Sequence, residues 1–433
     1  MTRSVHLRRT LPAGLAAAAL VSSALVVGLP GDARANGNGH GSARSVIFIN
    51  GDGMSAAHRE AARLAFAGFK GDLAMNTLGA TGLQTTDPDD VNDTITDSAA
   101  AATAWATGVK SYNGAISVAN APKDGKDAAG RTLLTLGAEA KRAGKATGIV
   151  TTAQVTDASP AAFFSTTDNR NNQDDIARQY LEVTKPDVIL GGGEDRWLPK
   201  GTPGAFPDAP AEDPTEASSG TKGNLITEAQ QLGYQYVTDG KALQRADGGK
   251  VLGLFSNEEM FQQKPEGKGD VYRPVVPLPD MASKALQTVS KDRDGFFLFI
   301  EEEGVDEFSH ENNGTRVLQS MQYLEKTVQI ARDYVKKHPD TLLIVTGDHD
   351  CGGLTVEGVD STDESGDGTT ISAEDGPFAI PGDTRKFVMD WTTSGHTGVP
   401  TVVTGTGYGS DQLVGYYPNT HLHDVMHQVL FGR

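Results

Sequence analysis

The chain has 433 residues, a formal net charge of −18 at pH 7 and one cysteine, Cys351. This acidity excludes nucleic-acid binding through a broad basic surface, so any anion-binding site must be built locally. A single cysteine excludes an intrachain disulfide, and stability must come from a large buried core, with bound metal as a second source.

The N-terminus has the pattern of an export signal. Arg8-Arg9 precede an apolar stretch over 11–29, and the small residues at 33–35 fit a cleavage site. We therefore expect a signal peptide over 1–35, a mature chain that begins at Asn36, and a secreted, extracellular protein. The arginine pair indicates twin-arginine export, with Sec export as the alternative. No later run has the length and apolarity of a membrane anchor.

Six short runs are apolar on both faces, as buried parallel strands are. They cover residues 46–49, 148–150, 188–190, 296–300, 342–345 and 401–403. Helical patterns lie between them, at 133–143 and at 317–335, where apolar residues recur every three or four positions. The alternation predicts an α/β fold, an open and mostly parallel sheet with helices on both faces. We expect one domain over 36–433, with loop insertions near 207–222 and 359–383, where small and polar residues dominate.

The run from Thr96 to Ala104 predicts a short alanine-rich helix with Ser98 at its head, directly after Asp97. Helix amides carry a partial positive charge at this end, so Ser98 would face an anionic group as a nucleophile. The alternative is structural, with Ser98 as an ordinary helix N-cap and Asp97 as a partner of the helix dipole.

Acidic and imidazole side chains follow the predicted strands closely. They are Asp52, Asp157, Glu301 and the pair Asp348-His349. Ligands of open α/β sheets bind at the carboxyl ends of the strands, so these side chains predict a site at that edge. For Asp52, between two glycines, the alternatives are a turn aspartate and a carboxylate shared by two metals.

Further side chains of this kind predict metal binding. Asp306 and His310 are one helical turn apart, and His396 lies in a glycine-flanked loop. Imidazole and carboxylate ligands together suit zinc. Cys351, two residues after His349, is either a soft ligand or a quiet free thiol, and we expect the thiol. His421, His423 and His427 are expected on a terminal helix that packs into the core, with metal binding as the alternative.

The motifs, in their order along the chain, resemble those of the secreted bacterial alkaline phosphatases. They are Asn50-Gly51-Asp52-Gly53-Met54, Thr96-Asp97-Ser98-Ala99-Ala100 with Thr103-Ala104, Glu301-x4-Asp306-x3-His310, Asp348-His349 and His396-Thr397-Gly398. The resemblance covers the chain from about residue 45 to its end. It implies a phosphomonoesterase with two Zn²⁺ and one Mg²⁺ that releases inorganic phosphate through a phosphoserine intermediate. It also allows a homodimer.

The resemblance further implies a role for each residue. Ser98 would be the nucleophile, and Arg170, thirteen residues after Asp157, would hold the phosphate with its planar guanidinium. The implied ligands are Asp306, His310 and His396 for the first zinc, Asp52, Asp348 and His349 for the second, and Asp52, Glu301, Ser159 and, directly or through water, Asp157 for magnesium.

Three departures from the family pattern qualify this assignment. Glu307 stands where well-known members carry a basic or aromatic residue, which weakens the local positive field and leaves the third cation open. The run 301–303 offers three candidate glutamates, of which family spacing selects Glu301. Ser159 replaces the threonine of many members and keeps the hydroxyl. Two rival functions stay open: a phosphodiesterase on the same scaffold, and an extracellular binding protein that has lost turnover.

Overall fold

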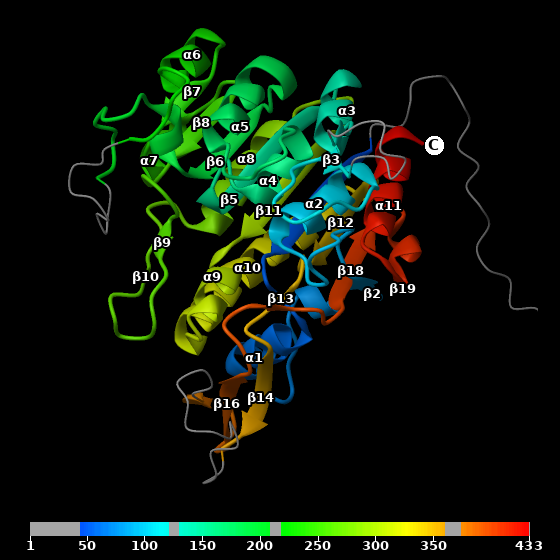
Figure 1. Cartoon of the computed structure of the whole chain (residues 1–433). Coiled ribbons are helices and arrows are strands. Elements are labelled where there is room, and N and C mark those ends of the chain that lie inside the picture. Colours follow the sequence, from blue (N-terminus) through cyan, green and yellow to red (C-terminus); the bar gives the residue numbers. More distant parts are fainter. Residues whose placement is uncertain (1–43, 121–129, 208–217, 360–373, 433) are drawn as a thin grey trace, which may run out of the picture. The chain divides into compact units, whose positions relative to one another are not determined.

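The apolar runs of the sequence form the centre of a ten-stranded, mostly parallel sheet (Figure 1). This computed structural model describes residues 44–120, 130–207, 218–359 and 374–432. The predicted signal peptide lies outside the described residues, as do 208–217 and 360–373 of the two predicted insertions. Within the described part, none of the helices combines the length and the apolarity needed to cross a membrane.

The predicted strands lie side by side in the sheet. Its order is β19 (Gly415–Pro418), β2 (Ala80–Thr85), β18 (Thr401–Gly407), β12 (Thr341–Thr346), β1 (Ser45–Gly51), β11 (Phe296–Glu302), β5 (Ala146–Gln154), β6 (Val188–Gly192), β8 (Val251–Leu254) and β7 (Gln235–Val237). The strands from β12 to β7 all run parallel, whereas β18 runs antiparallel to both β12 and β2. The expected α/β fold is therefore confirmed, with one reversed strand near an edge.

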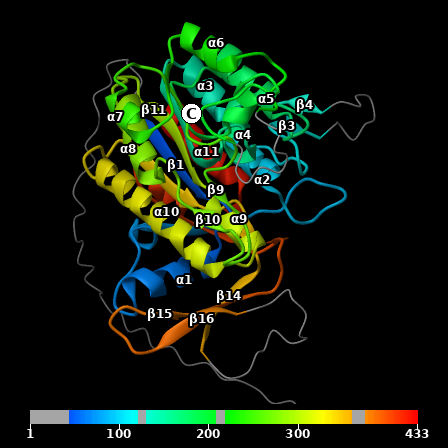
Figure 2. The same ribbon diagram turned by 90° about the vertical axis from the view of Figure 1, so that its left-hand side faces the viewer.

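Alternate residues of the central strands supply two hydrophobic clusters, one on each face of the sheet. Ile47 and Ile49 of β1 point into the first cluster, and Val46 and Phe48 point into the second. The first cluster includes residues of α1 (Ala56–Ala67), η1 (Met75–Thr77), α7 (Gly240–Arg245), α8 (Leu278–Val289), α9 (Gly304–His310) and α10 (Gly314–Val335). Figure 2 shows α8 and α10 lying along this face.

The second cluster is rich in aromatic side chains. Phe48 lies 4.9 Å from Trp105 and 6.1 Å from Phe299 between ring centroids. The cluster includes residues of α2 (Ser98–Thr107), α3 (Leu136–Arg142), α4 (Ala158–Phe164), α5 (Gln173–Gln179), the π-helical turn η2 (Tyr180–Thr184), η3 (Glu194–Trp197), α6 (Leu225–Gln231), η4 (Ser410–Leu413) and α11 (Thr420–Phe431). In Figure 1 the red α11 lies next to the cyan α2, which carries the predicted nucleophile.

Short strands complete the described fold. They are β3 (Val118–Ala119), β4 (Arg131–Thr132), β9 (Phe261–Gln262), β10 (Val271–Tyr272), β13 (Asp350–Cys351), β14 (Leu354–Gly358), β15 (Asp375–Ala379), β16 (Lys386–Trp391) and β17 (His396–Thr397). The range 359–383 was expected to be a loop, which is wrong for β15, because this segment pairs antiparallel with β16. The strand could not be predicted from its polar, glycine-containing sequence, because β15 is mostly exposed and has few apolar residues.

Candidate active site

The register of the sheet brings the predicted strand-end residues to one edge. Asn50, the penultimate residue of β1, pairs with Glu301 on one side and Thr346 on the other. Asp52 follows β1 directly, and Asp348 follows β12 after Gly347. Carboxylates that are far apart in the sequence thus meet at the carboxyl ends of parallel strands.

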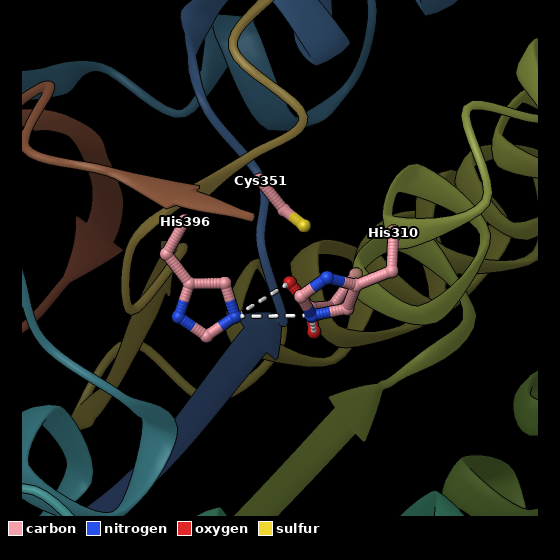
Figure 3. Close-up of side chains that lie close together, drawn as sticks. His310, Cys351 and His396 are labelled. Carbon is pink, nitrogen blue, oxygen red and sulfur yellow. Dashed lines mark hydrogen bonds and ion pairs between the residues drawn. The ribbon is translucent and has the colours of Figure 1, made fainter. Parts of the chain in front are cut away.

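One group of ligand atoms comprises Asp306, His310 and His396, together with Cys351 (Figure 3). Asp306 Oδ2 lies 3.1 Å from His310 Nε2, and the two imidazole Nε2 atoms lie 3.2 Å apart. The outer nitrogens are held by backbone carbonyls: His310 Nδ1 by Ser394 at 2.6 Å and His396 Nδ1 by Thr96 at 3.0 Å. These contacts orient the Nε2 atoms toward a common centre, as second partners of metal-binding histidines do.

A second group comprises Asp52, Asp348 and His349, all fully buried. His349 Nε2 lies 3.0 Å from Asp348 Oδ2 and 3.6 Å from Asp52 Oδ1. The backbone N–H of Gly53 donates to Asp348 Oδ1 at 3.0 Å. Gly53 has a φ of +67°, and a Cβ at this position would lie 2.5 Å from Asp306 Oδ1. Only glycine therefore lets the chain turn between the first and second groups.

A third group comprises Asp52, Glu301 and Glu303. Ser159, in α4, donates to Asp52 Oδ2 at 3.2 Å, so its hydroxyl lies on the same side. Glu302 turns away and accepts hydrogen bonds from Thr152 and Tyr272 at 3.0 and 2.6 Å. The structure thus brings Glu301 to the predicted site and adds Glu303, which the sequence analysis named only as an alternative to Glu301.

Several buried polar atoms of these groups and of the adjacent Asn50 have no hydrogen-bond partner among the described residues. They are Asn50 Oδ1, Asp52 Oδ1, Asp306 Oδ1, Asp348 Oδ2 and His349 Nδ1. Unsatisfied buried atoms are costly, and their concentration here is the pattern expected where cations complete the site. The donor set fits as well: imidazole and carboxylate in the first two groups suit zinc, and the all-oxygen third group suits magnesium.

Burial and neighbouring negative charges also shift the pKa values of the carboxyl groups in this site. Burial raises the pKa of Glu301 to about 8, and the charge of Asp157 adds to the rise, against hydrogen bonds from Thr151 and Asn50. Burial, reinforced by the charges of Asp348 and Asp306, raises the pKa of Asp52 well above its ordinary value. Such shifts mark a site in which negative charge is concentrated without compensation by the protein alone.

Ser98 begins α2, and its Oγ lies 3.3 Å from His349 Nε2. The N-cap is Asp97, whose Oδ1 accepts from the Ala100 N–H at 2.9 Å. Of the two alternatives for Ser98, the structure therefore excludes the N-cap. The hydroxyl stands at the positive end of a helix and beside the second ligand group, where a nucleophile would be placed.

Arg170 reaches the same side of the site. Its Nη1 lies 3.3 Å from Asp97 Oδ2, and its Nη2 lies 3.1 Å from Asp157 Oδ1. The Arg170 side chain is 27% exposed. Burial alone would lower the pKa of its guanidinium, but the charges of Asp157 and Asp97 raise it. A charged, partly accessible guanidinium fixed by two carboxylates is suited to bind a phosphate group.

The remaining candidates lie elsewhere or differ from expectation. Glu307, beside Asp306 in α9, has a pKa raised to about 8 by burial and by the Asp306 charge, so an acid does border the first group. The terminal histidines lie on α11, where His427 contacts Glu139 at 3.2 Å and His421 contacts a backbone carbonyl at 2.9 Å. Among the described residues, these histidines join none of the three ligand groups.

Comparisons with known proteins agree with this geometry. A model of the alkaline phosphatase family matches residues 43–380. Alkaline phosphatase 3 of Bacillus subtilis (strain 168) is 35% identical over 321 residues, which are 72% of this chain and 62% of that protein. Streptomycin-6-phosphate phosphatase of Streptomyces griseus is 32% identical over 459 residues, 93% of this chain and 95% of that protein. A mutant of TAB5 alkaline phosphatase with Mg bound in its M3 site gives a TM-score of 0.68 at 25% identity, over 89% of this chain and 97% of that one.

Proposed function

Since the chain belongs to the alkaline phosphatase family, we propose that it hydrolyses phosphate monoesters at this edge of the sheet and releases inorganic phosphate. The match spans only 62% of the length of the Bacillus subtilis relatives. The observation that carries the proposal is therefore local. Ser98 stands at the head of α2, 3.3 Å from His349, with Arg170 fixed on the same side.

The metal requirement is part of the proposal. The first and second ligand groups would hold one Zn²⁺ each, through Asp306, His310 and His396 and through Asp52, Asp348 and His349. The third group, with Ser159, would hold Mg²⁺, in line with the magnesium of the TAB5 structure. The chemistry that bound zinc supplies is a lowered pKa for the attacking hydroxyl and stabilisation of the leaving oxygen.

The chain's own residues then have distinct tasks. Arg170 would bind two phosphoryl oxygens through its parallel N–H groups, and the N-terminus of α2 would offset charge on the phosphoryl group. Ser98 Oγ would bond to phosphorus while the ester oxygen departs, which gives a phosphoserine that water hydrolyses in a second step. His349 would position Ser98, and Asp97 would position Arg170, through the contacts described above.

Export and assembly complete the proposal. The pattern over 1–35 supports secretion, and the family resemblance supports a homodimer. N-terminal sequencing of the exported protein tests the first expectation, with Asn36 as the expected first residue. Light scattering of the mature protein tests the second, and the mass of a monomer would contradict it.

The decisive experiment measures phosphate release from an aryl monoester before and after chelation, with zinc and magnesium added back. Activity should disappear with the chelator, return with the metals, and be lost in Ser98→Ala. Ser283→Ala, an exposed serine on α8, is the matched control and should keep full activity. Turnover of a diester alone would reject the substrate class. Phosphate binding without turnover of either ester would favour a binding protein.

A further inference from the structure

Cys351, which the sequence led us to expect as a free thiol, is buried among the ligand atoms of the first group. It lies in β13, pairs with His396 of β17, and its N–H donates to the Gly53 carbonyl at 3.1 Å. The side chain is fully buried. Figure 3 shows its sulfur directed toward the space between His310 and His396. The pairing of β13 with β17 thus fixes the positions of both Cys351 and His396.

We propose that Cys351 Sγ is a fourth protein ligand of the first metal site, beside Asp306, His310 and His396. The inference rests on the proposed function, because it requires a metal ion at this group. It departs from the ligand set that the resemblance implies, which contains no sulfur. On binding, the S–H bond breaks, a metal–sulfur bond forms, and the proton leaves to solvent.

The distances among the Asp306, His310 and His396 ligand atoms are close to those of a tetrahedral site, and the sulfur lies within the same cluster. Tetrahedral zinc with bond lengths of about 2.0–2.3 Å requires neighbouring ligand atoms about 3.3–3.8 Å apart. Asp306 Oδ1 lies 3.6 Å from His396 Nε2, and the two Nε2 atoms lie 3.2 Å apart. The four ligand atoms, sulfur included, all lie within 4.8 Å of one another. If all four side chains bind, zinc would take the leaving oxygen of the substrate as a fifth ligand, an expansion that catalytic zinc sites allow.

The alternative is a thiol that donates a hydrogen bond to Asp306 and does not bind the metal. Cys351 does form a side-chain hydrogen bond with Asp306, and burial, reinforced by the Asp306 charge and this bond, raises the pKa of the thiol well above its ordinary value while no metal is bound. Asp306 Oδ1 is nevertheless buried without a hydrogen-bond partner among the described residues. An unpartnered, buried carboxylate oxygen beside the sulfur is a second and independent indication of a cation. One thiolate and one carboxylate would also neutralise the two charges of Zn²⁺, which favours their burial together.

A sulfur ligand would make the first group prefer zinc, whereas the third group would still prefer magnesium. Thiolate favours zinc over magnesium, whereas the oxygen ligands of Asp52, Glu301 and Glu303 favour magnesium. Cys351→Ser should therefore weaken zinc binding at the first group by more than the roughly 10–100-fold loss typical of removing an outer partner of a ligand. Magnesium content should stay unchanged.

The experiment is X-ray absorption at the zinc edge on the zinc-loaded mature protein, together with the metal content of each variant. Because Cys351 is the only cysteine of the chain, a thiolate shell at about 2.3 Å can come from no other residue. Cys351→Ser should lose this shell. Thr397→Val is the matched control: Thr397 pairs with Asp350 in the same two-strand ladder, and its hydroxyl donates to Asp350 Oδ2 at 2.6 Å. It should keep the shell.

The absence of the shell in the wild-type zinc protein would overturn the inference, and so would its persistence in Cys351→Ser. The wild-type spectrum decides even where that variant fails to fold. A protein that binds no zinc would overturn both the inference and the proposed metal requirement. A sulfur shell combined with full activity of Ser98→Ala would support the inference and reject the proposed nucleophile, so the two failures are distinguishable.

Discussion

Replacement of Arg170 by alanine tests whether this side chain binds phosphate or merely joins two parts of the fold. The guanidinium contacts Asp97 and Asp157, each at 3.1–3.3 Å. If Arg170 holds phosphate, Arg170→Ala should lower kcat/KM and leave the fold intact. Helix α2 keeps its N-cap in this variant, because Asp97 still accepts from the N–H groups of Ala100 and Gly114.

The size of the loss follows from the geometry. Two hydrogen bonds to a charged group contribute about 1.5–3 kcal/mol each, or about 10²- to 10⁴-fold in kcat/KM. The Arg170 side chain is 27% exposed, and water weakens the interaction, so we expect about 10²- to 10³-fold. Arg170→Lys keeps the charge and loses the planar pair of donors, so its loss should be smaller. The two partly exposed ion pairs contribute at most about 1 kcal/mol each to stability.

The assay is aryl phosphate hydrolysis at saturating zinc and magnesium, with the melting temperature of each variant measured in parallel. Arg178→Ala is the matched control, because Arg178 also forms a partly exposed ion pair, with Glu182 at 3.0 Å, and lies outside the ligand groups. It should retain wild-type kcat/KM. The reasoning is refuted if Arg170→Ala keeps more than about a tenth of the wild-type kcat/KM, or if Arg178→Ala loses as much.

Three further predictions concern stability. Chelation should lower the melting temperature, because buried oxygens of Asp306 and Asp348 lose the cations that would satisfy them; calorimetry with zinc add-back measures this. In the chelated protein, the hydrogen bond with Asp306 raises the pKa of His310 from 6.5 to about 9. The stability that protonated His310 gives to the folded state is therefore complete below pH 6.5 and is lost as pH rises through 9. His310→Gln should flatten this fall in urea unfolding. Phe48→Ala should cost about 3–5 kcal/mol in the same assay, since the ring is fully buried, whereas Phe69→Ala, 45% exposed, should cost much less.

Each of these expectations has a contrary outcome. An unchanged melting temperature after chelation would mean that the protein alone satisfies the buried oxygens. A pH profile that His310→Gln leaves unaltered would assign the loss of stability to other groups. Equal costs at Phe48 and Phe69 would show that the aromatic cluster on the second face of the sheet contributes little to folding.

The sequence was sufficient to predict the central sheet but not its edges. Strands such as β1 and β11 are apolar on both faces because both are covered, which makes them visible without a structure. An apolar run carries no direction, so the reversal of β18 could not be predicted. Strand β2 was missed because its buried positions include Gln84, whose amide donates to Thr346, Gly347 and Thr401. In the sequence alone, a polar residue at such a position favours a loop over a buried strand.

The site was predictable where spacing alone determines proximity. Asp306 and His310 share a helix face, and Ser98 begins a recognisable helix. Glu303 was named only as an alternative to Glu301. It lies just beyond β11, where the chain has turned into the first residue before α9, so the alternation of side chains along the strand does not predict where it points. The position of Cys351 depends on its pairing with His396, a contact between distant segments that no local pattern records.

The ligand groups draw their side chains from almost the whole length of the chain, from Asp52 to His396. Even the contact between Ser98 and His349 joins residues 251 positions apart. A nascent or partly threaded chain therefore lacks the first group until His396 has been added, and an ion held tightly there would be acquired only after β17 has paired with β13. Metal content would then report on the completion of folding. A chain that crosses a membrane unfolded would take up its zinc from the compartment it enters, not from the one it leaves.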